Sequence, residues 1–227
     1  MPKGTVLDSR VRKSRTAKSR GVELLCRLVL SLTSGVAVGI VLACLTPHIA
    51  EQVADNLRRP SCSDPTGLVQ LHPTAAGDFL KTETLSFPPE NLVDGNTSTA
   101  WSENEPGLGL GSQVVFTFDK AVVDLRLMCV VNGYARSWDL YQQNPRVRSI
   151  LLEGRSPQGV VTNTTAVLED AGTQDHVAVF QDVHLLNGRY STLTMTIESA
   201  YSWTRVDGKE HYEDTSLSEI EFWGLPD

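Results

Sequence analysis

A run of six residues, QVVFTF at positions 113–118, places an apolar side chain at every second position on one side of the chain. Successive side chains of a β-strand point to opposite faces, so Val114, Phe116 and Phe118 would share one face. The run is also rich in β-branched and aromatic residues, which favour strands. It therefore predicts a half-buried strand.

The same alternation recurs along the rest of the chain. The alternating apolar positions are Leu125, Leu127, Cys129 and Val131, then Leu193, Met195 and Ile197, and finally Ile220 and Phe222. About eight such segments are separated by Gly, Asn, Asp and Pro clusters, with no convincing amphipathic helix between them. We therefore expect residues 68–227 to form one all-β domain, an antiparallel β-sandwich of the jelly-roll type.

A different pattern precedes this domain. The stretch LVLSLTSGVAVGIVLACL, residues 28–45, carries no charged side chain, and a bilayer core of roughly 30 Å needs about 20 apolar residues in a helix. Residues 22–45 are therefore predicted to be one transmembrane helix. Residues 1–21 carry seven Lys and Arg against Asp8 alone, which predicts a basic cytoplasmic tail under the positive-inside rule. The protein would then be single-pass in the cell membrane, in contact with the lipid bilayer, with its C-terminal domain outside.

Two alternatives to a retained helix remain. A cleaved signal peptide would need a shorter apolar run and a small-residue cleavage site. The sequence Val41-Leu42-Ala43-Cys44 resembles a bacterial lipobox, in which Cys44 would become lipidated. Residues 46–67 are expected to form an extracellular stalk or linker, in which Pro60 and Pro65 end any regular element.

The charge distribution limits the partners. The chain has 20 basic and 27 acidic residues; removing the 7 basic and 1 acidic residues of the tail leaves 13 and 26, a net charge of −13 for residues 22–227. Nucleic acids require clustered Lys and Arg, so no nucleic-acid partner is expected.

Cys62 and Cys129 both lie in the part predicted to be external, where disulfides persist. Cys129 is placed on the apolar face of its predicted strand, where a free buried thiol is also common. The sequence leaves open whether the two cysteines pair.

Two blocks carry a resemblance to a known family. Asp94, Gly95, Asn96, Thr99 and Trp101 match the pattern D-G-[ND]-x-x-T-x-W, and the stretch 218–224, SEIEFWG, matches the closing block S-E-I-x-F-x-G. The chain thus resembles the discoidin-like domains (coagulation factor 5/8 type C, galactose-binding-like). Asn132-Gly133-Tyr134-Ala135 and Asn144-Pro145-Arg146 are similar to a narrower branch, the glycan-binding translocation domain of NAD-glycohydrolase, which also occurs on bacterial single-pass proteins.

The first block predicts a structural Ca²⁺ site. Asp94, Asn96 and Thr99 bring hard oxygen donors into a tight loop, as Ca²⁺ prefers. The resemblance implies the remaining ligands, which are the carbonyls of Asn91 and Ser218 and the carboxylate of Glu219. The alternative is an Asx-type turn without metal, in which Asp94 and Asn96 cap neighbouring amides.

Aromatic residues in polar, turn-rich stretches are candidates for ligand binding. Stacking on aromatic faces, supplemented by hydrogen bonds from nearby polar groups, is what a sugar site needs, and binding sites collect on loops. The candidate residues are Trp138, Tyr141, Tyr201, Trp203 and Arg136. The alternative is that these aromatics fold down and close the end of the sandwich. Trp101 is expected in the core, and Asn144 and Arg146 are expected to form an internal hydrogen-bonded brace.

Nothing in the sequence indicates catalysis. The five His are scattered without metal-ligand spacing, and Gly107-Leu108-Gly109-Leu110-Gly111 is followed by a strand rather than by a phosphate-binding Lys-Ser/Thr. We expect a non-catalytic recognition module for glycan or cell-wall polysaccharide. The alternative is a structural or protein-interaction domain of an envelope complex without a sugar site.

Overall fold

The structure is a computed structural model that describes residues 60–119, 123–204 and 206–226. These belong to one compact unit, Pro60–Asp227, which has a hydrophobic core of its own formed by the described residues and is therefore expected to fold by itself. The predicted tail, transmembrane helix and most of the stalk lie outside this range. Within it, no helix is long and apolar enough to cross a membrane.

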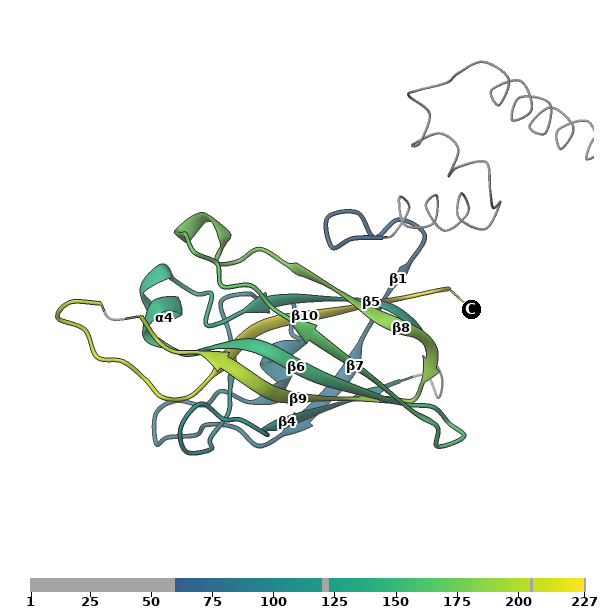
Figure 1. Cartoon of the computed structure of the whole chain (residues 1–227), viewed down its shortest axis with the longest axis horizontal. Helices are drawn as coiled ribbons and strands as arrows, with labels where there is room; N and C mark the ends of the chain where they lie inside the picture. The colour runs from purple at the N-terminus through teal and green to yellow at the C-terminus, as the bar shows by residue number, and fades with distance from the viewer. Residues whose placement is uncertain (1–59, 120–122, 205, 227) are drawn as a thin grey trace, which may run out of the picture. The chain divides into compact units, whose positions relative to one another are not determined.

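The described chain is mostly β-strand (Figure 1). Its strands are β1 (Val69–Leu71), β2 (Pro73–Gly77), β3 (Trp101–Ser102), β4 (Gln113–Phe118), β5 (Val123–Asn132), β6 (Arg146–Arg155), β7 (Val161–Val167), β8 (Gln181–Tyr190), β9 (Thr192–Tyr201) and β10 (Ser216–Gly224). Its helical segments are η1 (Pro89–Leu92), α4 (Trp138–Gln143) and η2 (Gln174–His176).

The strands form two antiparallel layers. One layer has the strand order β2-β4-β9-β6-β7. In the other layer, β10 pairs with β1, β3 and β5, and β5 pairs in turn with β8, which is an edge strand. The layers are joined by a single parallel pair between β6 and β10, Arg146 with Ser216. This arrangement confirms the predicted all-β sandwich.

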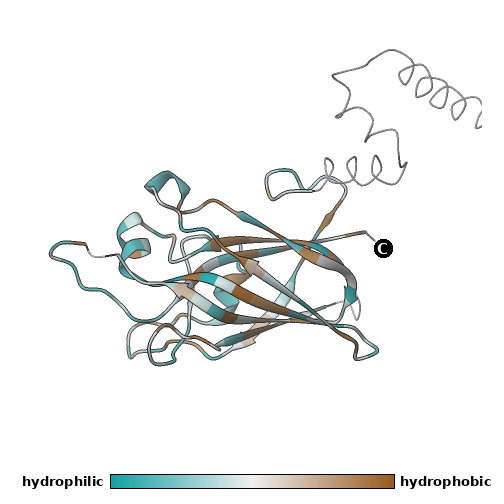
Figure 2. Cartoon of the chain, viewed as in Figure 1, coloured by the Kyte–Doolittle hydropathy of each residue, from teal (hydrophilic) through white to brown (hydrophobic). Residues whose placement is uncertain are grey.

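The core lies between the two layers. Val114, Phe116 and Phe118 of β4 are buried as predicted, and the ring of Phe222 from the opposite layer lies 4.9 Å from that of Phe116 and 5.6 Å from that of Phe118, between ring centroids. The brown, apolar colouring in Figure 2 lies largely on the strands, whereas the connecting loops are a mixture of hydrophilic and shorter apolar stretches. Trp101 is also fully buried, which confirms its expected place in the core.

The predicted face of β5 is wrong beyond Leu125. The register against β10 shifts by one residue between Leu125 and Leu127, which lie opposite the adjacent residues Gly224 and Trp223. A shift of one residue moves the following side chains to the opposite face. The core cluster contains Leu125, Met128 and Val130 instead of the predicted series. The side chains on both faces of β5 are buried from Leu127 onward, so the apolar pattern of this strand does not indicate which face points into the core.

Cys62 and Cys129 form a disulfide in the structure, which decides the alternative that the sequence left open. The Cys62 N–H also donates to Asp182 Oδ1 of β8 at 2.8 Å. The segment that precedes β1 is thereby fixed to β5 and β8. For this reason the compact unit begins at Pro60, before the predicted boundary at Leu68.

A short helix, α4, stands where the sequence suggested only a loop. The Ser137 hydroxyl caps it by accepting a hydrogen bond from the Leu140 N–H at 3.2 Å. At its other end the Asn144 side chain donates to the Leu140 carbonyl at 2.7 Å. Six residues are too few for an amphipathic period to be recognised, which explains why the pattern missed it.

Candidate functional site

The loop after η1 is pinned to the last strand by shared hydrogen bonds. The Asn96 N–H lies 2.9 Å from Asp94 Oδ1 and 2.9 Å from Glu219 Oε2, so one donor bridges two carboxylates. The Thr99 hydroxyl donates to Asp94 Oδ2 at 2.8 Å, and the Ser98 N–H donates to Asn96 Oδ1 at 3.1 Å. The two resemblance blocks, which are far apart in the sequence, therefore meet in space.

Glu219 carries an unusual charge environment. Its side chain is only 2% exposed. Burial, together with the nearby Asp94 carboxylate, raises the pKa of Glu219 to about 8, although the hydrogen bond from Asn96 acts in the opposite direction. A buried carboxylate beside another acid is stabilised by a cation.

The residues present fit a Ca²⁺ ion in their chemistry. Asp94, Asn96, Thr99 and Glu219 offer only oxygen donors, and two of these donors are carboxylates that lie together. The remaining predicted ligands flank this loop: Asn91 lies in η1, where its side chain donates to the Ala100 carbonyl, and Ser218 lies in β10, where its hydroxyl accepts from the Ala135 N–H. No group of three or more His, Cys, Asp and Glu side chains suited to a metal occurs in the described ranges.

The hydrogen bonds of the alternative, an Asx-type turn, are also present in this loop. Asp94 caps Asn96, and Asn96 caps Ser98, as such a turn requires. A cavity of about 260 Å³ lies beside the loop, lined by residues 70–73, 93–95 and 219–221. The two carboxylates, Asp94 and Glu219, are both part of its wall.

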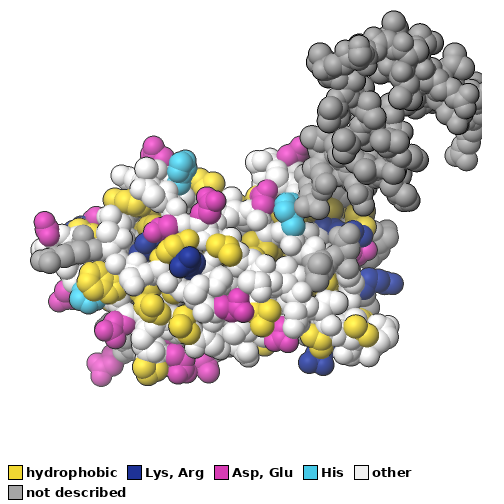
Figure 3. Space-filling view, viewed as in Figure 1, with side chains coloured by type: hydrophobic (Ala, Val, Ile, Leu, Met, Phe, Trp, Pro, Cys, Tyr) yellow, Lys and Arg dark blue, Asp and Glu magenta, His cyan; other side chains and the backbone are white. Residues whose placement is uncertain are grey.

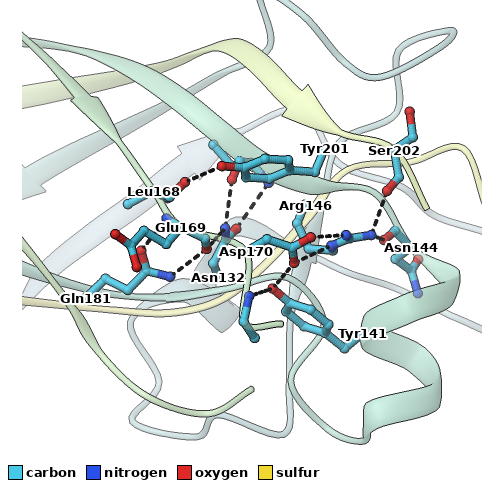
Figure 4. A network of polar contacts seen from close by, with 12 residues as sticks. Asn132, Tyr141, Asn144, Arg146, Leu168, Glu169, Asp170, Gln181, Tyr201 and Ser202 are labelled. Atoms are coloured by element: carbon cyan, nitrogen blue, oxygen red, sulfur yellow. Dashed lines mark hydrogen bonds and ion pairs between the residues drawn. The ribbon is translucent and has the colours of Figure 1, made fainter. Parts of the chain in front are cut away.

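A second polar centre is built around Arg146 (Figure 4). Its guanidinium is 3% exposed and holds Asp170 with two nitrogens, Nη2 to Oδ2 at 2.6 Å and Nε to Oδ1 at 3.3 Å. Nη1 donates to the carbonyls of Asn144 and Ser202 at 3.2 and 2.7 Å. One side chain thus connects the end of α4, the segment after β7 and the segment after β9.

Tyr141 completes this centre from α4. Its hydroxyl donates to Asp170 Oδ1 at 2.7 Å and accepts from the Ala171 N–H at 2.8 Å, and its ring centroid lies 5.2 Å from Arg146 Cζ. Burial raises the pKa of Asp170, but the hydrogen bonds from Arg146 and Tyr141 outweigh it and leave this pKa below its ordinary value. Asp170 therefore stays ionised and paired.

The branch motif Asn132-Gly133-Tyr134-Ala135 supports the same centre from β5. Asn132 exchanges hydrogen bonds with the backbone of Val147, its Nδ2 donating to the carbonyl at 2.7 Å and its Oδ1 accepting from the N–H at 3.1 Å. Gly133 has a φ of +71°, and a Cβ there would lie 2.6 Å from both the Arg146 and the Tyr141 side chains. The hydrogen bonds of Arg146 to the Asn144 carbonyl and of the Asn144 side chain to the Leu140 carbonyl confirm the internal brace that the sequence predicts.

Trp138, the first residue of α4, contacts this brace through the ring of Tyr141. Its ring stacks on that of Tyr141 with centroids 5.7 Å apart and planes 11° apart, and it is half-buried. Tyr141 itself is 2% exposed and both its hydroxyl contacts are internal. Tyr141 therefore supports Trp138 from below, and its burial argues against the predicted direct contact with a ligand.

The other predicted ligand residues separate into two groups. Trp203, half-buried in the β9–β10 loop, stacks on His211 with ring centroids 3.8 Å apart, and Arg136 is exposed before α4. Tyr201 is the last residue of β9. Its hydroxyl donates to the Leu168 carbonyl at 3.1 Å, and Arg148 Cζ lies 5.7 Å from its ring centroid. Tyr201 thus serves the internal framework more than the surface.

The β9–β10 loop, of which residues 202–204 and 206–215 are described, lies against α4. The Thr204 N–H donates to the Gln142 carbonyl at 2.7 Å, and the Tyr212 N–H donates to the Gln143 carbonyl at 2.9 Å. Lys209 forms an ion pair with Asp139 of α4. These contacts bring the elements that carry Trp138 and Trp203 together at one end of the domain, where acidic side chains are numerous (Figure 3).

Sequence reasoning missed Asp170, His211 and the Lys209–Asp139 pair. None of these residues stands in a motif. The partners of Asp170 and of the Lys209–Asp139 pair are remote in sequence, and His211 lies in the same loop as Trp203, where no periodic pattern indicates that the two rings stack.

The sandwich, with the loop after η1 pinned to the last strand, β10, defines a discoidin-like domain of the F5/8 type C class. A family model described as "NAD glycohydrolase translocation F5/8 type C domain" matches residues 66–223. Because this match spans more than half of the chain, the protein belongs to that family. A comparison with curated proteins found no match.

Solved structures with a similar fold include carbohydrate-binding modules. CBM32-3 from a family 31 glycoside hydrolase of Clostridium perfringens is 17% identical, with 70% of this chain and 92% of that chain covered and a TM-score of 0.47. CBM32-5 of CpGH89 from the same organism, in complex with GalNAc-β-1,3-galactose, is 11% identical, with coverages of 68% and 99% and a TM-score of 0.49.

Proposed function

We propose that this domain is a non-catalytic recognition module that binds glycan, including cell-wall polysaccharide, at the end formed by α4 and the β9–β10 loop. One observation supports this most: two half-buried Trp rings are each backed by a stacked ring, Trp138 by Tyr141 and Trp203 by His211. Aromatic faces that are fixed before binding lose little conformational entropy when a sugar stacks on them. The Arg146 brace holds both elements in place.

Replacing Trp138 by Ala should weaken glycan binding about tenfold while costing only about 1 kcal/mol of unfolding free energy, because the side chain is only partly buried. Binding to a glycan array and calorimetric titration of the best ligand, using residues 60–227, would measure the first effect. Thermal melting would measure the second.

Trp223→Ala is the matched control, because Trp223 is also half-buried but lies on β10. Equal loss of affinity in both variants would contradict the proposed site. If the unaltered domain binds no glycan on the array, the alternative gains support, namely a protein-interaction domain of an envelope complex.

We also propose that Asp94, Glu219 and the loop between them hold a structural Ca²⁺. With the ion bound, the two carboxylates would be neutralised and the loop would be joined to β10. Asn96, Thr99 and the carbonyls of Asn91 and Ser218 would supply the further oxygens. This role stabilises the fold and involves no reaction.

The Ca²⁺ proposal predicts a melting-temperature difference. At a Ca²⁺ concentration about 100 times its dissociation constant, the domain should gain about 2.7 kcal/mol, or roughly 5–10 °C in melting temperature, over the same protein in EDTA. Asp94→Ala should abolish the gain, whereas Asp175→Ala, at an exposed position in η2, should retain it. If the unaltered domain melts at the same temperature in Ca²⁺ and in EDTA, the loop is an Asx-type turn that binds no metal.

We further propose that residues 22–45 anchor the chain in the cell membrane, with the basic tail in the cytoplasm and the domain outside. The charge asymmetry of the first 21 residues supports this orientation. The Cys62–Cys129 disulfide supports it independently, because disulfides persist outside the cytoplasm and are rare within it.

A further inference from the structure

Strand β7 forms one margin of the sandwich. It pairs antiparallel with β6 from Ser149–Val167 to Arg155–Val161 and forms a ladder with no other strand among the described residues. It also contacts β8, which runs near it in Figure 1, and the Thr162 hydroxyl donates to the Tyr190 hydroxyl at 3.1 Å, but the two strands are not paired. An edge of this kind leaves a row of backbone N–H and C=O groups available to another strand. Side chains alternate along it, with Val161 and Val167 exposed to 42% and 69%.

The other edge strands carry features that discourage pairing, and β7 does not. β1 and β3 have only three and two residues, and β2 is short and begins with Pro73. β8 carries the charged Asp182 and Arg189 and a register irregularity against β5. The sequence of β7, VTNTTAV, has no charge, no Pro and no bulge in its ladder with β6. Natural proteins usually protect such an edge, so an unprotected one indicates a partner.

The sequence of β7 is compatible with a second copy of itself. If two copies pair antiparallel about a two-fold axis at Thr164, Val161 of each lies opposite Val167 of the other, and Asn163 lies opposite Thr165. Both exposed Val pairs become apolar cross-strand contacts, and no charge meets a like charge, although residues 22–227 have a net charge of −13. The charged neighbours Glu153 and Arg155 lie one strand away, on β6.

We propose that two copies of this domain associate through β7 in this register, which would extend the β6–β7 layer across both. A C2 interface needs such a self-complementary surface. With seven residues on each side, the interface is at the small end of specific interfaces, so association is weak and concentration-dependent.

Two double variants test the register. Val161→Lys with Val167→Lys places Lys opposite Lys at both ends of the paired strands and should make residues 60–227 monomeric at every concentration. Val161→Lys with Val167→Glu places Lys opposite Glu and should restore the dimer, with an affinity that falls as salt is added. Sedimentation equilibrium from about 1 µM to about 500 µM would measure all three proteins, a range suited to weak interfaces.

Both substituted positions are exposed, so both variants should melt close to the unaltered domain. A monomeric unaltered domain over the whole range would overturn the proposal. So would a Lys/Lys variant that dimerises normally, since another surface would then be used. A Lys/Glu variant that folds and stays monomeric would overturn the two-fold register.

Discussion

Loss of the Cys62–Cys129 disulfide should lower the unfolding free energy of residues 60–227 by about 4 kcal/mol. The bond closes a loop with a sequence separation of 67 residues, and the chain-entropy estimate for a loop of this length gives that magnitude. For a domain of this size the melting temperature should fall by roughly 10 °C. Thermal melting of Cys62→Ala against the unaltered oxidised domain measures the effect.

The fragment contains no other cysteine, because Cys26 and Cys44 precede it. The unaltered domain in excess reductant should therefore melt with the Cys62→Ala variant, while reductant should not change the variant. If oxidised and reduced domains melt together, the bond contributes nothing to stability.

The same bond also tests the proposed placement. In cells, thiol alkylation before and after reduction should show Cys62 protected in the mature chain, as an external domain requires. A chain whose Cys62 is fully alkylated without reduction would argue for a reducing compartment and against the proposed topology.

The fold could be predicted from the sequence because strand patterns are local. The 113–118 run has one apolar and one polar face, so its alternation reports its burial directly. The face of β5 could not be predicted, because that strand is apolar on both sides and its one-residue register shift depends on β10, near the end of the chain. The turn after η1 could be predicted because its chemistry is local: Gly95 adopts a positive φ, and Asp94 and Asn96 cap amides two residues along the chain.

The candidate site could be predicted only in part. Trp138 and Trp203 stand out as aromatics in polar stretches, but their sequence context does not distinguish them from Tyr141, which has the same surroundings and is buried. Tyr141 is buried because its hydroxyl donates a hydrogen bond to Asp170, which lies in a loop further along the chain and also accepts from the Arg146 guanidinium. Tertiary hydrogen bonds, rather than local pattern, decide which ring faces solvent.

Replacing Arg146 by Ala should cost about 3 kcal/mol of unfolding free energy. The variant leaves Asp170 without its ion-pair partner and two carbonyls without their donor, and removal of one partner of a buried pair typically costs about 3–5 kcal/mol. We expect the lower figure because the Asp170 side chain is 37% exposed. Arg148→Ala, at an exposed position two residues along β6, is the matched control and should change stability little.

The pH dependence of the unfolding free energy shows whether the loss in Arg146→Ala comes from the ion pair with Asp170. The pKa of Asp170 is held below its ordinary value of 3.8, so its pairing stabilises the fold above that pH and is lost as the pH falls through the lowered value. In Arg146→Ala this part of the acid destabilisation should disappear, so the two proteins should converge in stability towards low pH. Equal loss of stability at all pH values would assign the effect to packing. If glycan affinity also falls in Arg146→Ala and not in Arg148→Ala, then the brace positions the Trp rings without touching the ligand.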